Sequence, residues 1–238
     1  MTHQDVAKEL QTRADPVKAA NSARFFKTGP GQYGEGDQFI GIVVPEQRKV
    51  ARMFRQLPLE ETLQLLHSPI HEHRLTALFI LVDQYKRGTE AERAAIYDAY
   101  MANMRWVNNW DLVDSSASYI VGPQLGDNYQ PTLAKLAQSE DLWERRIAML
   151  ACFFTIGQGD PKPAFFVINI LKDDQHDLIQ KAVGWMLREI GKHCGRNTLH
   201  RWLLHNNTYK SLPRTTLRYA IEHYSQPERK AFLQGTAR

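Results

Sequence analysis

One carboxylate stands out in the segment RWVNNWDLVDSS, because it lies in an otherwise apolar stretch of a predicted helix. Asp114 follows Trp110 by four residues, so the two side chains fall on nearly the same face, one turn apart. Asn108 or Asn109 fits the N-cap and Asp111 the first turn, which are structural roles. A carboxylate in an apolar stretch must face solvent, a cation or a site. A carboxylate can stabilise developing positive charge, and an indole face attracts cations, so Trp110 and Asp114 are candidate functional residues.

Related stretches elsewhere in the chain place cationic residues at matching positions. Four of them open with a basic residue and continue into an apolar helix, and the segment from Asn109 fits between the first two. Aligned at steps of 36, 36, 35 and 33 residues, the stretches put these residues in register: Arg74, Trp110, Arg146, Lys181 and Arg214. One turn later the aligned residues are Leu78, Asp114, Leu150, Trp185 and Arg218.

If this face lines a groove, the groove is basic and aromatic and carries one carboxylate. Cations suit phosphates, and aromatic faces suit bases or cations. The alternative is that Trp110 and Trp185 are simply core residues, as most helical tryptophans are.

The elements that must position these residues are helical almost throughout. Apolar residues recur at three- and four-residue steps, and Gly and Pro divide the chain into about a dozen helices. One helical hairpin per repeat is typical of solenoids, because a single hairpin cannot bury its apolar face alone. We therefore predict an all-α fold of HEAT-like helical-hairpin repeats, stacked into a curved superhelix with a concave basic groove. The prediction is one domain over residues 1–238.

Composition excludes several classes of protein. The 238 residues are 43% hydrophobic and 24% charged, which excludes intrinsic disorder, and two cysteines exclude a disulfide-stapled scaffold. No apolar run approaches the roughly 18 residues that span a bilayer. The N-terminal segment MTHQDVAKELQTRADP lacks the apolar region of a signal peptide. We expect a soluble cytoplasmic protein without a membrane partner.

The charge is unevenly distributed along the chain. The net charge is +4, but residues 179–238 hold 11 Lys and Arg against 3 Asp and Glu. This basic C-terminal quarter indicates either a polyanion-binding surface or a solubilising one, and charge alone does not separate them.

Longer strings carry a family resemblance over nearly the whole chain. They occur in one order: the run from Ala23 with GEGDQFIGIVVPEQR, then WDLVDSS, LWERRIAML, IQKAVGWMLREIGKH and LPRTTLRYAIEHY. With these strings the sequence resembles the DNA alkylation-repair glycosylases of the AlkD-like, HEAT-repeat family.

The resemblance implies roles for individual residues. The catalytic aspartate of the family falls on Asp114, with Trp110 and Trp185 as the active-site aromatics. Arg146 and Arg188 match residues expected at the DNA backbone. The groove register adds further candidate DNA-binding residues: Arg74, Lys181, Arg214 and Arg218. Where the family can carry a tyrosine near the first helices, this chain has Phe25-Phe26, which keeps the aromatic surface without the hydroxyl contact.

The resemblance also implies a reaction. It is that of a monofunctional DNA glycosylase that excises N3-methyladenine and N7-methylguanine from double-stranded DNA, without a base-reading pocket. The alkylated base is cationic, and cleavage of its glycosidic bond develops oxocarbenium character that a carboxylate can stabilise. No metal or other cofactor is implied, and we expect a monomer.

Two other functions stay open at this point. One is a non-catalytic HEAT-repeat module that binds damaged or branched DNA, and the other is a protein-binding scaffold. The cluster His67, His71 and His73 lacks a metal-binding pattern, and the glycine-rich loop 29–37 lacks a phosphate-loop pattern, so we expect a flexible connector there. Lys181, one turn from Trp185, leaves lyase chemistry open.

Overall fold

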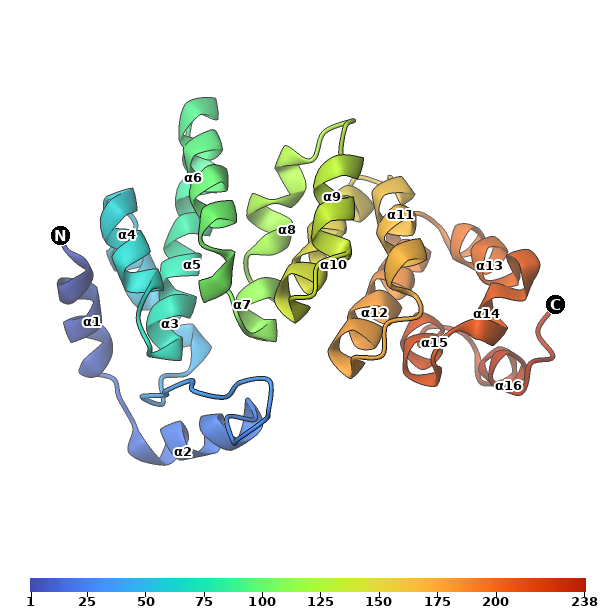
Figure 1. Cartoon of the computed structure of the whole chain (residues 1–238), viewed down its shortest axis with the longest axis horizontal. Coiled ribbons are helices and arrows are strands. Elements are labelled where there is room, and N and C mark those ends of the chain that lie inside the picture. Colours follow the sequence, from blue (N-terminus) through green and yellow to red (C-terminus); the bar gives the residue numbers. More distant parts are fainter. The chain divides into compact units, whose positions relative to one another are not determined.

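The protein is all-helical, as predicted. A computed structural model describes residues 1–238 (Figure 1). It contains α-helices and short 3-10 helices and no β-strand, and one isolated parallel bridge joins Gln38 to Ile70. No helix has both the length and the apolar character needed to cross a membrane. The chain divides into two compact units, Met1–Ile120 and Val121–Arg238. The single domain over residues 1–238 and the concave basic groove stay predictions.

The first unit is built around one long, buried helix, α5. The helices of the unit are α1 (His3–Gln11), α2 (Pro16–Phe25), α3 (Val44–Met53), α4 (Leu59–Leu66), α5 (His71–Arg87), α6 (Glu90–Ala102), α7 (Trp110–Asp114) and α8 (Ala117–Ile120). Helix α5 packs against α3, α4, α6, α7 and α8. Every residue of α5 from His71 to Val82 is buried, polar ones included. The first turn of α5 must therefore satisfy its charges internally.

The second unit stacks helical hairpins in series. Its helices are α9 (Gln130–Ala137), α10 (Leu142–Gly157), α11 (Lys162–Leu171), α12 (Asp177–His193), α13 (Arg196–Leu204), α14 (Thr208–Ser211), α15 (Arg214–Ala220) and α16 (Gln226–Gln234). Helix α10 packs on α12, and α12 packs on α15, while α9 packs on α11. Alternate helices thus form successive layers, as expected for stacked hairpins.

The repeat register falls where the sequence places it. The five aligned residues lie in the first turn or two of α5, α7, α10, α12 and α15. Two of these helices, α7 and α10, begin at a polar N-cap residue that satisfies free N–H groups of the first turn. Asp141 accepts N–H bonds from Trp143 and Glu144, and the Asn109 side chain accepts one from Trp110.

The helix that carries Asp114 is shorter than predicted. Helix α7 ends at Asp114 and α8 begins at Ala117, so Asp114 is a C-terminal residue and does not lie inside a long helix. The hydroxyl of Ser116 donates to the carbonyl of Leu112 at 2.6 Å. Serine bonding back to a carbonyl competes with the helical ladder, which explains the break.

Helices α12 and α15 approach each other closely at one glycine. A Cβ on Gly184 would lie 2.6 Å from the carbonyl oxygen of Thr216 and 2.6 Å from Cβ of Tyr219. The hydroxyl of Thr216 donates to the carbonyl of Gln180 at 3.1 Å, which holds the two helices at this distance. The absence of a side chain at Gly184, next to Trp185, therefore allows the close approach of α12 and α15.

We expect Gly184→Ala to destabilise the protein. Alanine gains about 1 kcal/mol of helix propensity over glycine, but the clash with backbone costs about 1–3 kcal/mol and more if α15 is displaced. The matched control is Gly157→Ala in α10, where an added Cβ meets nothing within 4 Å. Urea unfolding should show a loss of stability for Gly184→Ala alone. Equal stability of the two variants would contradict this packing.

Candidate active site

A cluster of buried polar side chains lies at the start of α5. His71 Nδ1 lies 2.9 Å from the carboxylate of Asp37, and His71 Nε2 lies 2.8 Å from the carboxylate of Asp111. Arg74 donates to Asp37 at 2.5 Å, and the side-chain amide of Asn109 donates to Asp37 at 3.2 Å. The cluster thus joins the loop before α3, helix α5 and the start of α7.

The electrostatics of the cluster favour a charged His71. Burial alone would lower the pKa of His71, but hydrogen bonds and charges from Asp111 and Asp37 outweigh it and raise the pKa to about 9. Burial of Asp37 is likewise outweighed, so His71 and Arg74 hold the pKa of the Asp37 carboxyl below its ordinary value. Two cations and two carboxylates therefore face one another inside the first unit.

The next residue of α5, Glu72, holds the segment that follows the glycine-rich loop. The buried carboxylate of Glu72 accepts N–H bonds from Ile40, Gly41 and Ile42 at 2.7–3.2 Å. Gly41 has φ +83°, and a Cβ there would lie 2.0 Å from the carbonyl oxygen of Asp15. The sequence predicts a flexible connector over 29–37; its last residue, Asp37, and the chain that follows are instead pinned to α5.

Aromatic rings stack above this pinned segment. Phe26 is stacked on Trp110, with ring centroids 5.2 Å apart, and on Phe39, at the same distance. The imidazole of His71 lies 4.8 Å from the ring of Phe26 and 4.6 Å from that of Phe39. Phe25 meets Trp110 edge-on at 5.8 Å and is 65% exposed. The sequence predicts an aromatic surface at Phe25-Phe26, and in the structure both rings contact Trp110.

Helix α7 brings Trp110 and Asp114 together. Both side chains are half-buried, at the two ends of this five-residue helix. Burial raises the pKa of the neighbouring Tyr100 well above its ordinary value, and the charge of Asp114 adds to this effect. The hydroxyl of Tyr100 is 3.0 Å from that of Ser116. The sequence-predicted pair thus lies beside a buried hydrogen-bonded network.

Arg74, a predicted DNA-binding residue, is buried in this structure. It is 2% exposed, and its guanidinium donates to Asp37 and to the carbonyls of Ser68 and Pro69. The guanidinium of Arg74 is thus turned toward acceptors of the protein itself. The register places Arg74 near the start of α5, where Asp37 from the preceding loop pairs with it, and its contact with DNA stays a prediction.

In the second unit a buried carboxylate holds the other candidate tryptophan. The indole N–H of Trp185 donates to Glu189 at 3.1 Å, and its ring lies 5.9 Å from that of Phe153. Arg188 donates to the same oxygen of Glu189 at 3.0 Å and also pairs with Glu222. Glu189 therefore positions both Trp185 and Arg188.

The other cationic candidates of this unit differ in accessibility. Arg146 is 5% exposed and donates to the carbonyl of Leu178 at 2.7 Å. Lys181 is half-buried and pairs with Asp177 at 2.8 Å. Arg214 is exposed and donates to the carbonyl of Leu233, and Arg218 is exposed without a protein partner. The exposed cations are thus those of α15.

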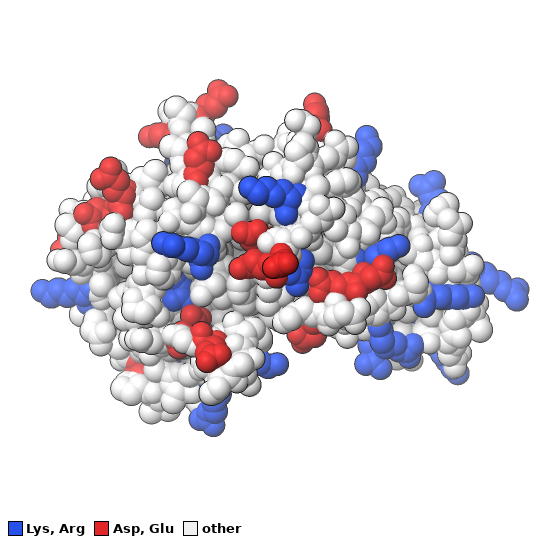
Figure 2. Space-filling model, viewed as in Figure 1, with Lys and Arg blue, Asp and Glu red and all other residues white.

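A shallow basic hollow lies between α15 and α16. Arg214, Arg229 and Lys230 line it, together with Gln226, Leu233 and Gln234, and no carboxylate is among them. The nearby carboxylate of Glu228 is paired with Arg196 and Ser225 instead. Figure 2 shows Lys and Arg side chains gathered over this C-terminal part of the chain. The structure therefore keeps the cations of this hollow unneutralised.

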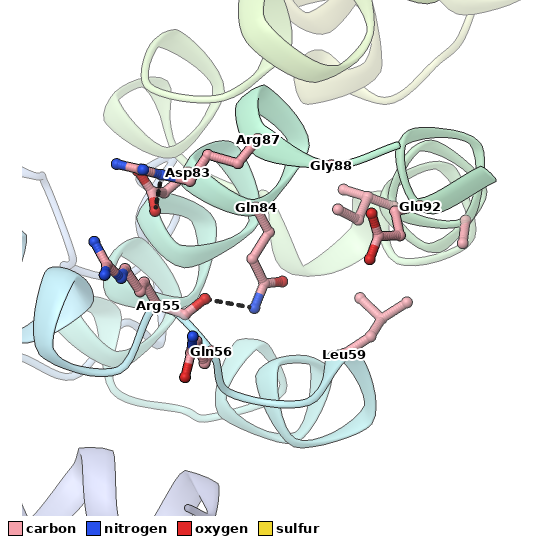
Figure 3. A pocket seen from close by; sticks show the side chains of 10 residues that line it. Arg55, Gln56, Leu59, Asp83, Gln84, Arg87, Gly88 and Glu92 are labelled. Atoms are coloured by element: carbon pink, nitrogen blue, oxygen red, sulfur yellow. Dashed lines mark hydrogen bonds and ion pairs between the residues drawn. The ribbon is translucent and has the colours of Figure 1, made fainter. Parts of the chain in front are cut away.

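A pocket of about 570 Å³ in the first unit lies away from the candidate residues. It is formed by α5, α6, the start of α4 and the chain between α3 and α4 (Figure 3). Arg87 pairs with Asp83, and the Gln84 amide donates to the carbonyl of Arg55. Neither Trp110 nor Asp114 lines this pocket, so it does not form a base pocket around them.

The histidines near α5 have protein partners and form no metal-ligand group. His67 lies 2.7 Å from the side-chain oxygen of Asn103, and His73 lies 3.0 Å from the hydroxyl of Ser68. No group of three or more His, Cys, Asp or Glu in the structure is arranged to hold a metal.

Comparison with known proteins identifies the class of protein. The family of DNA alkylation repair enzymes matches residues 6–224, so the chain belongs to this family. No curated protein matches the chain. A solved structure, described as a predicted DNA alkylation repair enzyme from Enterococcus faecalis, is similar with a TM-score of 0.66 and 19% identity. The match covers 90% of this chain and 98% of that one, and it supports the fold. Membership supports a role in the repair of alkylated DNA.

Sequence reasoning missed the role of His71. The sequence pattern indicates at most a weak metal ligand at this position, whereas His71 bridges two carboxylates. The available signal was the pairing of acidic and basic residues between GEGD, which ends at Asp37, and HEHR, which begins at His71.

The charge of His71 should make stability depend on pH. Because its folded pKa of about 9 is above the ordinary value of 6.5, the stabilisation is complete below pH 6.5 and is lost as pH rises through 9. We expect the free energy of unfolding to fall by about 3 kcal/mol over this range. Urea titrations at several pH values measure it. His71→Gln should lack this slope, and an unchanged slope in the variant would assign it to other groups.

Proposed function

We propose that this protein is a monofunctional DNA glycosylase that hydrolyses the N-glycosidic bond of cationic alkylated purines, N3-methyladenine and N7-methylguanine, in duplex DNA. The observation that carries the proposal is the placement of Trp110 and Asp114 on one short helix, α7, whose first turn is fixed by Asn109 and His71. Membership of the DNA alkylation repair family supports the substrate class.

The proposed chemistry uses the carboxylate of Asp114. Loss of the charged base leaves positive charge on the deoxyribose, and a nearby carboxylate stabilises it and orients the attacking water. Trp110 offers an indole face to the cationic base and excludes water, which strengthens the interaction of Asp114 with the sugar. A base that is already cationic is a good leaving group, so this scheme needs no pocket that reads the base.

The roles proposed for the second unit follow the family resemblance. Trp185 is the second active-site aromatic, and Glu189 fixes its indole. Arg146, Arg188 and Lys181 are proposed to meet DNA phosphates, although each also has a protein partner. Arg214 and Arg218 are the exposed cations that suit the backbone best, because binding would not require them to leave a carboxylate.

Asp114→Asn should abolish most excision without loss of DNA binding. Loss of one preorganised electrostatic group costs roughly 100- to 1,000-fold in rate. The measurement is single-turnover release of 3-methyladenine and 7-methylguanine from methylated duplex DNA, with binding followed by fluorescence anisotropy. The matched control is Asp98→Asn, an exposed carboxylate on α6 of the same unit, which should leave the rate unchanged.

Other outcomes of this experiment separate the alternatives. Equal release by wild type and Asp114→Asn keeps a glycosylase but removes Asp114 from its mechanism. No release by wild type, with salt-sensitive DNA binding, favours a non-catalytic DNA-binding module. Efficient excision of neutral hypoxanthine contradicts selection by the charge of the base.

Binding should weaken with salt through the cations of α15. Each phosphate contact contributes about 0.9 to the slope of log affinity against log salt concentration. Arg214→Gln with Arg218→Gln should therefore reduce the slope by about 2, equally for damaged and undamaged duplexes. Arg87→Gln, an exposed arginine paired with Asp83, serves as the control. A slope that changes as much in Arg87→Gln as in the double variant would show no specific role for α15.

A further inference from the structure

The residues behind Trp110 form a continuous bridge that no role in the proposed reaction yet explains. It runs from Asp37 in the loop, through His71 on α5, to Asp111 on α7, with contacts of 2.9 and 2.8 Å. His71 is 1% exposed. Its ring also supports Phe26 and Phe39, and Phe26 stacks on Trp110. The bridge is thus connected to Trp110 in two ways, through Asp111 on the same helix and through the ring of Phe26.

We propose that His71 is a positioning residue, which as an imidazolium between Asp37 and Asp111 holds Trp110 and Asp114 in the arrangement needed for excision. The inference rests on the proposed glycosylase function. It adds a residue that touches neither the base nor the sugar and acts through α7 and the aromatic stack.

The geometry requires both ring nitrogens of His71 to donate. A carboxylate only accepts hydrogen bonds, and one lies against each nitrogen. A neutral imidazole has a single N–H, so its second nitrogen would point a lone pair at Asp37 or Asp111. One side of the bridge would then lose its hydrogen bond, and a nitrogen lone pair would face a carboxylate oxygen. The raised pKa of about 9 agrees with this geometry.

Asp111 is the weaker side of the bridge when the proton is lost. Asp37 keeps Arg74 and Asn109 as donors, whereas the carboxylate of Asp111 accepts from His71 and from the N–H of Leu112. Deprotonation of His71 therefore releases Asp111 first.

Helix α7 depends on this anchor. It has five residues, too few to be stable on its own hydrogen bonds. Its orientation is set by the Asn109 cap, the bond from Asp111 to His71 and the stacking of Trp110 on Phe26. If Asp111 is released, Trp110 and Asp114 move together, because they occupy the two ends of the same helix.

The groups that face His71 are few, so its titration can be assigned. The loop contributes Asp37, α7 contributes Asp111, and α5 contributes Arg74 and Glu72, whose carboxylate is occupied by backbone N–H groups. His73, on the same helix, has its pKa lowered to about 4 by burial and by Arg74. His73 therefore stays neutral over the range in which His71 loses its proton.

The first test compares His71→Gln with His73→Gln, a buried histidine of α5 outside the bridge. We expect His71→Gln to lower the single-turnover excision rate roughly 10- to 100-fold at saturating enzyme, with nearly unchanged affinity for DNA. His73→Gln should lower thermal stability while its folded fraction reacts at the wild-type rate. Equal rates in wild type and His71→Gln would overturn the proposal.

The second test uses Asp111→Asn, which keeps the shape and one acceptor and so guards against misfolding of the first variant. Removal of one carboxylate lowers the pKa of His71, so excision should fall with rising pH earlier than in wild type. If this pKa falls by about one, the ratio of the rates at pH about 6.5 and about 8.5 should change roughly threefold. The positioning role would be contradicted if the excision rate fell at the same alkaline pH in both proteins. An aspartate with a purely structural role would not change the pH of this fall.

The indole N–H resonance of Trp110, assigned with Trp110→Phe, separates this inference from the proposed function. If wild type does not excise methylated purines, the glycosylase proposal fails. The resonance should still move between pH about 7 and about 10 in wild type, and at lower pH in Asp111→Asn. A resonance that does not respond to pH or to this variant would show that the bridge does not position Trp110.

Discussion

The buried imidazolium of His71 is the interaction on which the first unit depends. Charge inside a protein is costly unless each group is paired and hydrogen-bonded. Here the first turn of α5 supplies two cations, His71 and Arg74, and receives two carboxylates, Asp37 and Asp111, from other segments. The requirement for pairing fixes where the loop and α7 must lie. The local geometry of the candidate site follows from it.

Each unit holds a candidate tryptophan with a buried charged group, but the charge has the opposite sign in the two units. In the first, a buried cation supports a tryptophan through stacked phenylalanines and through the helix on which the tryptophan lies. In the second, the buried carboxylate of Glu189 accepts directly from the indole of Trp185 and also holds Arg188. In both, the aromatic side chain is half-buried and its orientation is fixed by a charged group behind it. An indole whose orientation is already fixed loses little conformational entropy when it contacts a substrate.

The all-helical fold could be predicted from the sequence because it depends on the periodic spacing of apolar residues. Apolar spacing and repeat register located α5, α7, α10, α12 and α15, and the register residues lie near the start of each. Register gives the position of a residue around a helix, but it does not show what covers that position. Residues at equivalent register positions can therefore differ in exposure: Arg74 and Arg146 are buried, whereas Arg214 is exposed. The bridge through His71 depends on residues 34 and 40 positions away in sequence, which no helical period relates.

Whether a cation is exposed or already paired decides how much it can contribute to binding a polyanion. An arginine that already pairs with a carboxylate must exchange that partner for a phosphate, so much of the gain is cancelled. Arg74 is committed to Asp37, and Arg188 is shared between Glu189 and Glu222. Arg214, Arg229 and Lys230 line a hollow that has no carboxylate among its lining residues. The basic C-terminal quarter is thus weighted toward its last helices, whereas the cations nearer the candidate tryptophans serve first to hold the protein's own side chains.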